Sequence, residues 1–375
     1  MPAIFVLIII PLLFYILIPA AGAFRVRKIW RLFRTKMIDS SFFPICDYKD
    51  IIASQSEGYY RFFGEIEAVQ SDGYIWVKNS SITMSVKMKH CHIYMIPSEK
   101  KRNSQMPIKL PWNRVFSIAE GTAIYISGEV IVENGRVAFS GTRKDPLTVI
   151  LYDGEIKTLL ERSISCGRQK NEYWNFLTPW SIASGGIISL LLLDMMIKAS
   201  VSSSILIFGI IVSSLPIIPF IPPGLLFFYL YSNMWKKGRL CRSDRDLVSL
   251  PLRFEERNII DSSYVHIKFN DENPVFPVIG EYTVRKVQFD KKVISDDTLW
   301  NNSVFGKLVS LKDGRWLCAP NDPMKEFLMI KDDPYVLIQK SNKKAFRFEV
   351  LSLISFFLAM SMNIVIFVQV IKVFM

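Results

Sequence analysis

Residues 3–24 read AIFVLIIIPLLFYILIPAAGAF, and this stretch decides the class of the protein. It has no charged residue and is long enough to cross a hydrocarbon core, which takes about 20 helical residues. Its Ala21-Gly22-Ala23 end looks like a signal-peptidase site, but a signal peptide carries basic residues before its apolar stretch, and here they follow it. We therefore interpret residues 3–24 as the first transmembrane helix, with cleavage as the alternative.

The overall composition also indicates a membrane protein. Of the 375 residues, 50% are hydrophobic and only 21% are charged, and the mean hydropathy is +0.24. This composition excludes a disordered chain and an ordinary soluble enzyme. Because the net charge of +12 stands next to apolar spans, it indicates an anionic membrane surface rather than nucleic acid as the partner.

Three further apolar stretches predict a multi-pass α-helical membrane protein with four spans. Residues 179–198 and 203–231 read as a helical hairpin, and residues 348–370 as the last span. Prolines in the second half of the third span must break or kink its helix, since they remove backbone donors. These are Pro216, Pro219, Pro222 and Pro223.

Basic residues set the expected orientation. They follow the first and third spans and precede the fourth, so the positive-inside rule places both termini outside and the two intervening regions in the cytoplasm. We expect the cytoplasmic membrane of a bacterium.

The first region between spans has the alternation of β-strands. Its clearest hairpin runs from Ala123 to Phe139, with Asn134-Gly135 as the type I′ turn and Gly128 as a bulge or barrel bend. A second hairpin begins at Phe62 and turns at Asp72-Gly73. For residues 57–160 we predict an OB-like barrel of about five strands.

Residues 232–346 read as a second β-rich domain. Strands are predicted over 265–269 and 278–289, and a hairpin over 309–318. Gly-Glu-apolar tripeptides at 64–66, 128–130 and 280–282 raise the hypothesis that the two domains are duplicates, against chance similarity of strand sequences.

Residues 25–38 predict an amphipathic helix, because apolar residues recur there at helical spacing and basic residues occupy the remaining face. We expect its apolar face in the acyl boundary and its basic face against lipid phosphates. The alternative is that the apolar stripe packs on the barrel. The expected membrane-surface contacts are Arg25, Arg27, Lys28, Trp30, Arg31, Phe33 and Arg34.

A juxtamembrane helix is predicted over 161–178, and it contains an unusually polar and aromatic segment. The aromatic residues suit an interfacial belt and the cations suit phosphates, so anchoring is one interpretation. The other is a docking surface for a protein partner or a lipid headgroup. The candidate surface consists of Arg168, Lys170, Glu172, Tyr173, Trp174 and Asn175.

Within the spans, Asp194 and Lys198 are spaced to form an interfacial ion pair, and Asn363 can bond between helices. The cysteines and histidines have no ligand spacing: His90, Cys91 and His92 are consecutive, and the others stand alone. We therefore expect no metal and no cofactor. We name no catalytic residue, because no nucleophile elbow, P-loop, GxGxxG or HExxH motif occurs.

The stretch EGTAIYISGEVIVENGRVAFSG from Glu120, followed by DPLTVILYDGEIKTLLERSIS and an apolar helix, resembles the membrane-anchored domain before the RING finger of GIDE-type mitochondrial ubiquitin ligases. The resemblance covers residues 57–200 and rests on the strand pattern with Gly128, Gly135 and the Leu159-Leu160 helix. No Cys/His pairs of a RING follow, so ligase activity is not implied. A looser resemblance is to NfeD-type proteins, whose OB-like barrel is tethered to spans. Both imply a membrane-tethered interaction module.

These observations predict a scaffold or assembly factor that displays β-rich domains at the cytoplasmic membrane surface. The expected partners are a bilayer with anionic headgroups and other proteins, without nucleic acid. The alternative is a membrane-embedded enzyme or transporter that acts on a lipid, with the broken third span and residues 168–175 forming its site.

Overall fold

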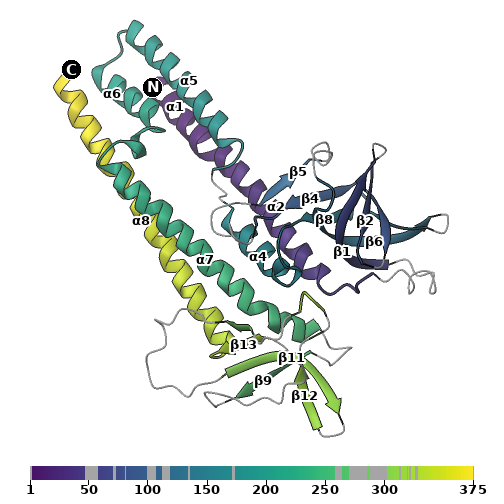
Figure 1. Ribbon diagram of the computed structural model, residues 1–375. Coiled ribbons are helices and arrows are strands. Elements are labelled where there is room, and N and C mark those ends of the chain that lie inside the picture. The colour runs from purple at the N-terminus through teal and green to yellow at the C-terminus, as the bar shows by residue number, and fades with distance from the viewer. Residues whose placement is uncertain are drawn as a thin grey trace. The chain divides into compact units, whose positions relative to one another are not determined.

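The structure is a computed structural model of the chain (Figure 1). It describes residues 2–46, 58–70, 73–80, 82–98, 107–111, 119–133, 136–170, 174–257, 264–269, 285–287, 302–311, 314–318, 320, 322–325 and 328–374.

The N-terminal helices follow one another directly. α1 (Pro2–Ile10) leads into a π-helical turn, η1 (Pro11–Leu17), and then into α2 (Ile18–Ser40). Pro19 lacks the N–H that an α-helix would direct at the Tyr15 carbonyl, which favours a local change of hydrogen-bond register. The predicted first span and the predicted amphipathic helix are therefore parts of one helical run.

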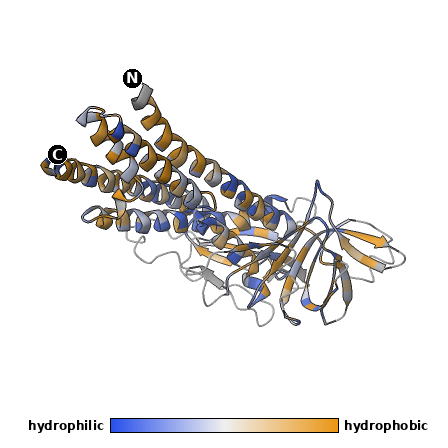
Figure 2. Ribbon diagram, turned by 90° about the horizontal axis from the view of Figure 1, so that it is seen from above, coloured by the Kyte–Doolittle hydropathy of each residue, from blue (hydrophilic) through white to orange (hydrophobic). Residues whose placement is uncertain are grey.

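Three helices are long and apolar enough to cross a membrane: Phe5–Ser40, Thr178–Lys198 and Pro334–Val373. Figure 2 shows hydrophobic residues along these helices. The predicted third span is instead broken. It consists of a shorter apolar helix, α6 (Ser203–Ser214), then a 3₁₀ turn, η5 (Ile218–Phe220), and then the start of α7 at Gly224. The break expected from the prolines is confirmed, because they occupy the interval between the two α-helices.

The helices next to the predicted spans differ in length from the expectation. α7 (Gly224–Arg257) continues through the first part of the predicted second β-rich domain, and α8 (Pro334–Phe374) begins before the predicted fourth span. α4 (Leu159–Gln169) ends before the predicted end of the juxtamembrane helix, and α5 (Thr178–Lys198) follows. Residues 232–257 are helical because apolar side chains on one face, such as Val248 and Leu252, are buried.

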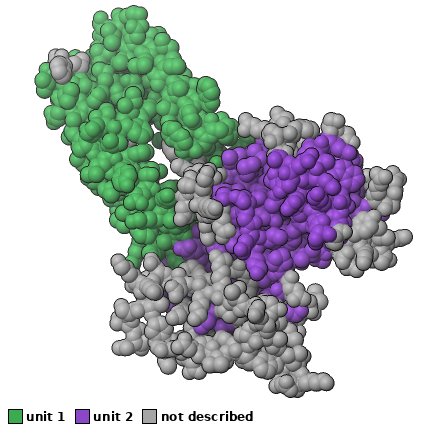
Figure 3. All heavy atoms as spheres, viewed as in Figure 1, with its two compact units in different colours: residues 1–31, 169–242, 341–375 green, residues 32–168, 243–340 purple. Residues whose placement is uncertain are grey.

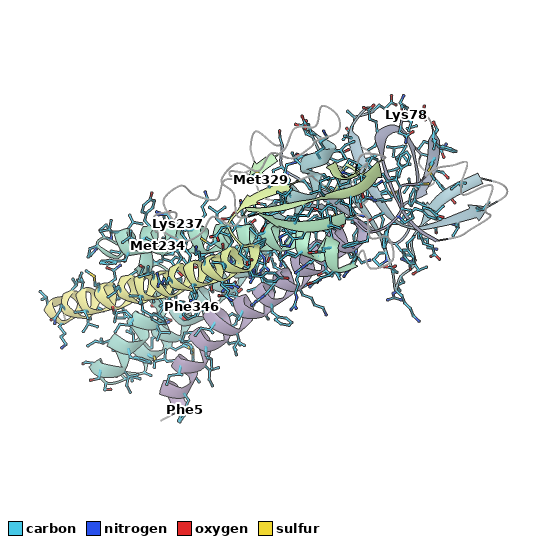
Figure 4. All side chains as sticks on the ribbon, turned by 90° about the horizontal axis from the view of Figure 1, so that it is seen from below. Phe5, Lys78, Met234, Lys237, Met329 and Phe346 are labelled. Atoms are coloured by element: carbon cyan, nitrogen blue, oxygen red, sulfur yellow. The ribbon has the colours of Figure 1, made fainter. Side chains whose placement is uncertain are left out.

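α7 and α8 run antiparallel, side by side in Figures 1 and 4. Gly224 lies against Ala359, whereas Gly238, further along α7, lies against Ala345, which is earlier in α8. Lys237 on α7, labelled in Figure 4, also contacts α8, since its Nζ lies 6.0 Å from the centroid of the Phe348 ring. The absence of a side chain at the two glycines lets the helix backbones approach closely.

Eight strands form the first sheet, and five of them close a barrel. The sheet runs β1-β2-β3-β7-β6-β8-β4-β5, and an additional β1–β6 pairing closes the ring β1-β2-β3-β7-β6. β3 and β7 pair in parallel and the other ring pairs are antiparallel. The strands are β1 (Gly58–Val69), β2 (Tyr74–Lys78), β3 (Thr83–Lys87), β4 (Cys91–Met95), β5 (Ile108–Leu110), β6 (Ala123–Glu133), β7 (Arg136–Ser140) and β8 (Leu147–Leu151).

The predicted hairpin from Ala123 to Phe139 is confirmed as β6 and β7, and its Asn134-Gly135 turn lies outside the described residues. The predicted bend at Gly128 is also confirmed. Before Gly128, β6 pairs with β8, and after it β6 pairs with β7. Gly128 has φ 154°, and a Cβ atom there would collide with Leu147, so the position requires glycine.

The second sheet has five described strands, all from the second region between spans. They are β9 (Tyr264–Phe269), β10 (Arg285–Val287), β11 (Asn302–Leu311), β12 (Gly314–Cys318) and β13 (Leu328–Lys331). β11 pairs with β9, β12 and β13, and β10 pairs in parallel with β13. The predicted strand at 265–269 and the hairpin at 309–318 are confirmed. Only β10 of the predicted 278–289 stretch is described, and Gly280–Tyr282 lies outside the described residues.

The chain divides into two compact units (Figure 3). Unit 1 consists of residues 1–31, 169–242 and 341–375, and unit 2 of residues 32–168 and 243–340. Within unit 1, the N-terminus, the α5–α6 connection and the C-terminus lie at the same end (Figure 1). Unit 2 contains the described strands of both β-rich regions.

Candidate functional site

Arg168, part of the predicted interaction surface, is engaged inside unit 2. Its Nε donates to Asp246 Oδ2 at 2.6 Å, and Arg245 Nε donates to Asp246 Oδ1 at 3.0 Å. Burial of the Asp246 carboxyl opposes its ionisation, but the hydrogen bonds and charges of the two arginines outweigh burial and lower its pKa. Arg168 therefore joins the end of α4 to α7 and is not a freely exposed docking residue.

Asn175, another residue of that surface, is buried in unit 1. Its Nδ2 donates to the Pro19 carbonyl at 3.0 Å, and its Oδ1 accepts the Leu177 N–H at 3.0 Å. A Cβ atom at Gly22 would collide with the Asn175 carboxamide, so glycine is needed for this approach. Asn175 fixes the segment before α5 against α2, which is a structural role.

The other residues of the candidate surface differ from one another in exposure. Lys170 is half-buried, which lowers its pKa, and its Nζ lies 5.9 Å from the centroid of the Trp30 ring. Trp174 is exposed. Glu172 and Tyr173 lie outside the described residues. The structure thus brings Lys170 and Asn175 onto α2 but does not unite the predicted set on one exposed face.

The predicted lipid contacts of α2 need a correction for its apolar stripe. Trp30 is 6% exposed and Phe33 is 1% exposed, so neither presents a surface to lipid. The Phe33 ring packs on Tyr94 of β4 at a centroid distance of 4.4 Å, and Met37 is also buried. The alternative interpretation, in which the stripe packs on the β-rich region, holds for Phe33, whose ring contacts Tyr94.

The basic residues of α2 also separate into two groups. Arg34 Nη1 donates to the Gly167 carbonyl at 3.1 Å, which directs this side chain into unit 2. Arg25, Arg27, Lys28 and Arg31 are exposed and remain available for the predicted contact with lipid phosphates.

A buried ion pair of Arg61 in unit 2 is not among the contacts predicted from the sequence. Arg61 on β1 is 3% exposed, and its Nη2 forms an ion pair with Asp322 Oδ2, while its Nε donates to the Phe43 carbonyl at 2.7 Å. This contact joins the barrel to the region between β12 and β13. The signal was a single arginine inside the aromatic run Tyr59-Tyr60-Arg61-Phe62-Phe63.

Further buried polar groups surround this ion pair. The Tyr125 hydroxyl on β6 donates to Ser40 Oγ at 2.7 Å, and burial raises the pKa of Tyr125 to about 12. We call Ser40, Phe43, Arg61, Tyr125 and Asp322 the Arg61 junction. Its contacts connect the end of α2, two barrel strands and the second β-rich region.

Two polar features of unit 1 match their predictions. Lys198 Nζ lies 2.6 Å from Asp194 Oδ2, in an exposed ion pair. Asn363 on α8 is buried, and its Nδ2 donates to the carbonyls of Ile218 and, at 2.7 Å, of Ile221, while its Oδ1 accepts the Gly224 N–H at 3.1 Å. Asn363 therefore ties both sides of the proline break to α8.

The described residues contain no group of three or more His, Cys, Asp or Glu that could hold a metal ion. Burial raises the pKa of Cys91 to about 12, and burial, with the charges of Lys109 and Lys36, lowers the pKa of His92 to about 4. Both side chains are thus neutral near pH 7, and Cys91 is a protonated thiol rather than a reactive thiolate.

No family model, no curated protein and no solved structure matches this chain.

Proposed function

We propose that the protein is an integral membrane scaffold or assembly factor. The observation that carries the proposal is the composition of unit 2, which combines residues 32–168 with residues 243–340. The apolar helices α5 and α6 separate these two parts in the sequence, and the Arg61–Asp322 ion pair joins them. A chain that returns from apolar helices to complete one body offers a composite surface, as a scaffold requires.

The barrel is proposed to be OB-like and to be the interaction module. Support comes from the ring order β1-β2-β3-β7-β6, from the parallel β3–β7 pair, and from the long β1 that pairs with both β2 and β6. OB barrels hold their partners on the face of strands 2 and 3 and on neighbouring loops. The proposed docking face is therefore that of β2 and β3, in agreement with the resemblance to GIDE-type and NfeD-type tethered domains.

Four crossings and cytoplasmic β-rich regions complete the proposal. An even number of crossings is supported by the N-terminus, the α5–α6 connection and the C-terminus at one end of unit 1 (Figure 1). The basic residues that follow the apolar parts of α2 and α7 support the cytoplasmic side. Reporter fusions at Asn134 and Met375 test this topology, and a signal outside the cytoplasm from Asn134 would contradict it.

The function is tested by in-cell crosslinking and purification of the full chain, with mass spectrometry of both proteins and lipids. Lys78, labelled on β2 in Figure 4, is exposed on the proposed face. Lys78→Glu should reduce recovery of a stoichiometric protein partner. Lys157→Glu, an exposed lysine before α4, is the charge-matched control and should leave recovery unchanged. Equal recovery with both variants would contradict docking on β2 and β3.

The lipid-handling alternative makes a different prediction in the same experiment. It requires a retained lipid species without a stoichiometric protein. Of the residues expected to form its site, Arg168 pairs with Asp246 and Asn175 bonds to Pro19, so each already has a structural role.

A further inference from the structure

We propose that Arg27, Lys28 and Arg31 form a binding site for the phosphate of an anionic phospholipid. The three residues are called the α2 cation face. The inference rests on the membrane placement proposed above, and it does not depend on whether unit 2 binds a protein partner.

The α2 cation face is a compact, exposed surface. Arg27 and Arg31 are four residues apart and Lys28 and Arg31 are three apart, so the three side chains are neighbours on the helix. All three are exposed. Phe24, one turn before Lys28, is 72% exposed and is the last apolar residue of the uncharged stretch. This order places an apolar contact next to the cations, as at the boundary between acyl chains and headgroups.

The charges of this face are not compensated within the described structure. Arg27, Lys28 and Arg31 take part in no hydrogen bond, ion pair or ring contact with any described residue, whereas Arg25 lies over the Phe176 ring at 5.7 Å and Arg34 bonds to Gly167. Like charges at these spacings destabilise a helix. An anion between the three side chains removes this repulsion.

A second, independent feature indicates that the membrane interface lies near the α2 cation face. The segment at the start of α5 exposes three large aromatic side chains, which is typical of an interfacial belt. They are Trp174 (56%), Phe176 (57%) and Trp180 (77%). The Asn175–Pro19 hydrogen bond and the Arg25–Phe176 contact hold this segment beside residues 19–25 of α2. The α2 cation face begins just beyond that level, where headgroup phosphates lie.

The chemistry of the three side chains selects the ligand. Two guanidinium groups can each bind a phosphate through paired N–H donors, and the ammonium group adds a point charge. A lipid with net negative charge gains from all three cations, whereas a zwitterionic headgroup presents its own cation to them. Each basic residue near an anionic surface contributes roughly five-fold to binding.

The test uses the full chain in nanodiscs of phosphatidylcholine with or without phosphatidylglycerol. Lipids that remain bound after mild detergent extraction are quantified by mass spectrometry. The triple variant Arg27→Gln/Lys28→Gln/Arg31→Gln should lose phosphatidylglycerol enrichment by roughly five-fold per cation removed. The control Lys89→Gln/Arg143→Gln/Lys144→Gln removes the same charge from exposed barrel loops and should keep the enrichment.

Three outcomes would overturn the inference. An equal loss in the control variant would indicate general charge attraction, and unchanged enrichment in the triple variant would place the lipid elsewhere. Thermal stabilisation of the protein in phosphatidylcholine nanodiscs by inorganic phosphate alone, to the extent given by phosphatidylglycerol, would identify a soluble anion as the ligand. Failure of the protein to enter any nanodisc would instead contradict the membrane placement, and with it the proposed function.

Discussion

The two units hold distant segments together through different kinds of polar contact. Among the described contacts of the apolar stretches in unit 1, neutral side chains bind the backbone: Asn175 binds Pro19, Ser181 binds Phe14 and Asn363 binds the proline break. In unit 2, ion pairs do the equivalent work, with Arg61 on Asp322 and Arg168 on Asp246. The bidentate Arg242–Glu349 pair of unit 1 lies beyond the apolar part of α7.

The membrane placement proposed for unit 1 accounts for this difference. An ion in a hydrocarbon environment has a large desolvation cost, whereas a carboxamide can satisfy freed backbone groups at lower cost. Ile218 is an example: its carbonyl accepts the Ile221 N–H in the 3₁₀ turn, and Asn363 adds a second donor where Pro222, four residues later, has no N–H. In unit 2, the buried Arg61 and Asp322 offset their desolvation cost because they pair with each other and each also bonds to a backbone group.

The largest expected effect is at Arg61. Arg61→Met leaves the mostly buried Asp322 carboxylate without its guanidinium partner, which should destabilise unit 2 by about 3–5 kcal/mol. The free energy of unfolding is measured by denaturant titration of the full chain in detergent micelles.

Asp39→Asn is the matched control for this change. It breaks the ion pair between Asp39, which is 40% exposed, and Arg257, which is 54% exposed. The free energy of unfolding should fall by less than about 1 kcal/mol. Similar losses for the two variants would mean that burial does not set the strength of ion pairs in unit 2.

The second effect is at Asn363. Asn363→Leu removes three hydrogen bonds across the proline break, and at an average of about 0.6 kcal/mol for each such bond in a membrane the loss should be about 2 kcal/mol. The shift in unfolding during an SDS titration measures it. Ser361→Ala, at an exposed position on α8, should have little effect. Gly224→Ala should resemble Asn363→Leu, because a Cβ atom there would displace the carboxamide.

The third effect tests the charge of Asp246. Asp246→Asn should lower stability at neutral pH by about 1–2 kcal/mol, since hydrogen bonds to a charged group are weakened. The folded-state pKa of Asp246 is lowered, so its contribution is complete above the unfolded value near 3.8 and is lost as the pH falls through the folded value. Stability curves of the wild type and the variant should therefore converge below pH 3.8. A constant difference at all pH values would assign the effect to packing.

The smallest effect is expected at the exposed ion pair of α5. Lys198→Ala separates a pair whose side chains are 75% and 56% exposed, and it should change stability by no more than about 0.5 kcal/mol. The same SDS titration as for Asn363 measures the change. A loss as large as that of Asn363→Leu would show that this pair is shielded from solvent.

Local sequence patterns were sufficient to predict the structural features whose physical cause lies in neighbouring residues. The prolines after Ser214 predicted the broken span, Gly128 predicted the change of strand partner, and the alternation from Ala123 predicted the hairpin. The interhelical hydrogen bonds of Asn363 were predictable because a polar amide in an apolar helix needs a partner.

Other features could not be read from local pattern. Residues 232–257 were assigned to a β-rich domain, although their apolar face is helical and becomes recognisable only once its packing is known. Trp30 and Phe33 were assigned to lipid because their spacing is the same for a lipid-facing and a protein-facing stripe. Phe33 is buried through Tyr94, which is far away in the sequence.

The sequence by itself determined that β-rich regions lie between helices apolar enough to cross a membrane, because both signals come from neighbouring residues. Uncharged stretches must satisfy their backbone hydrogen bonds as helices, and alternating stretches bury one face as strands. Only the tertiary structure decided that the two β-rich regions form one unit, and that Arg168 and Asn175 are internal. Those outcomes depend on which distant groups meet, and on the burial that follows from their meeting.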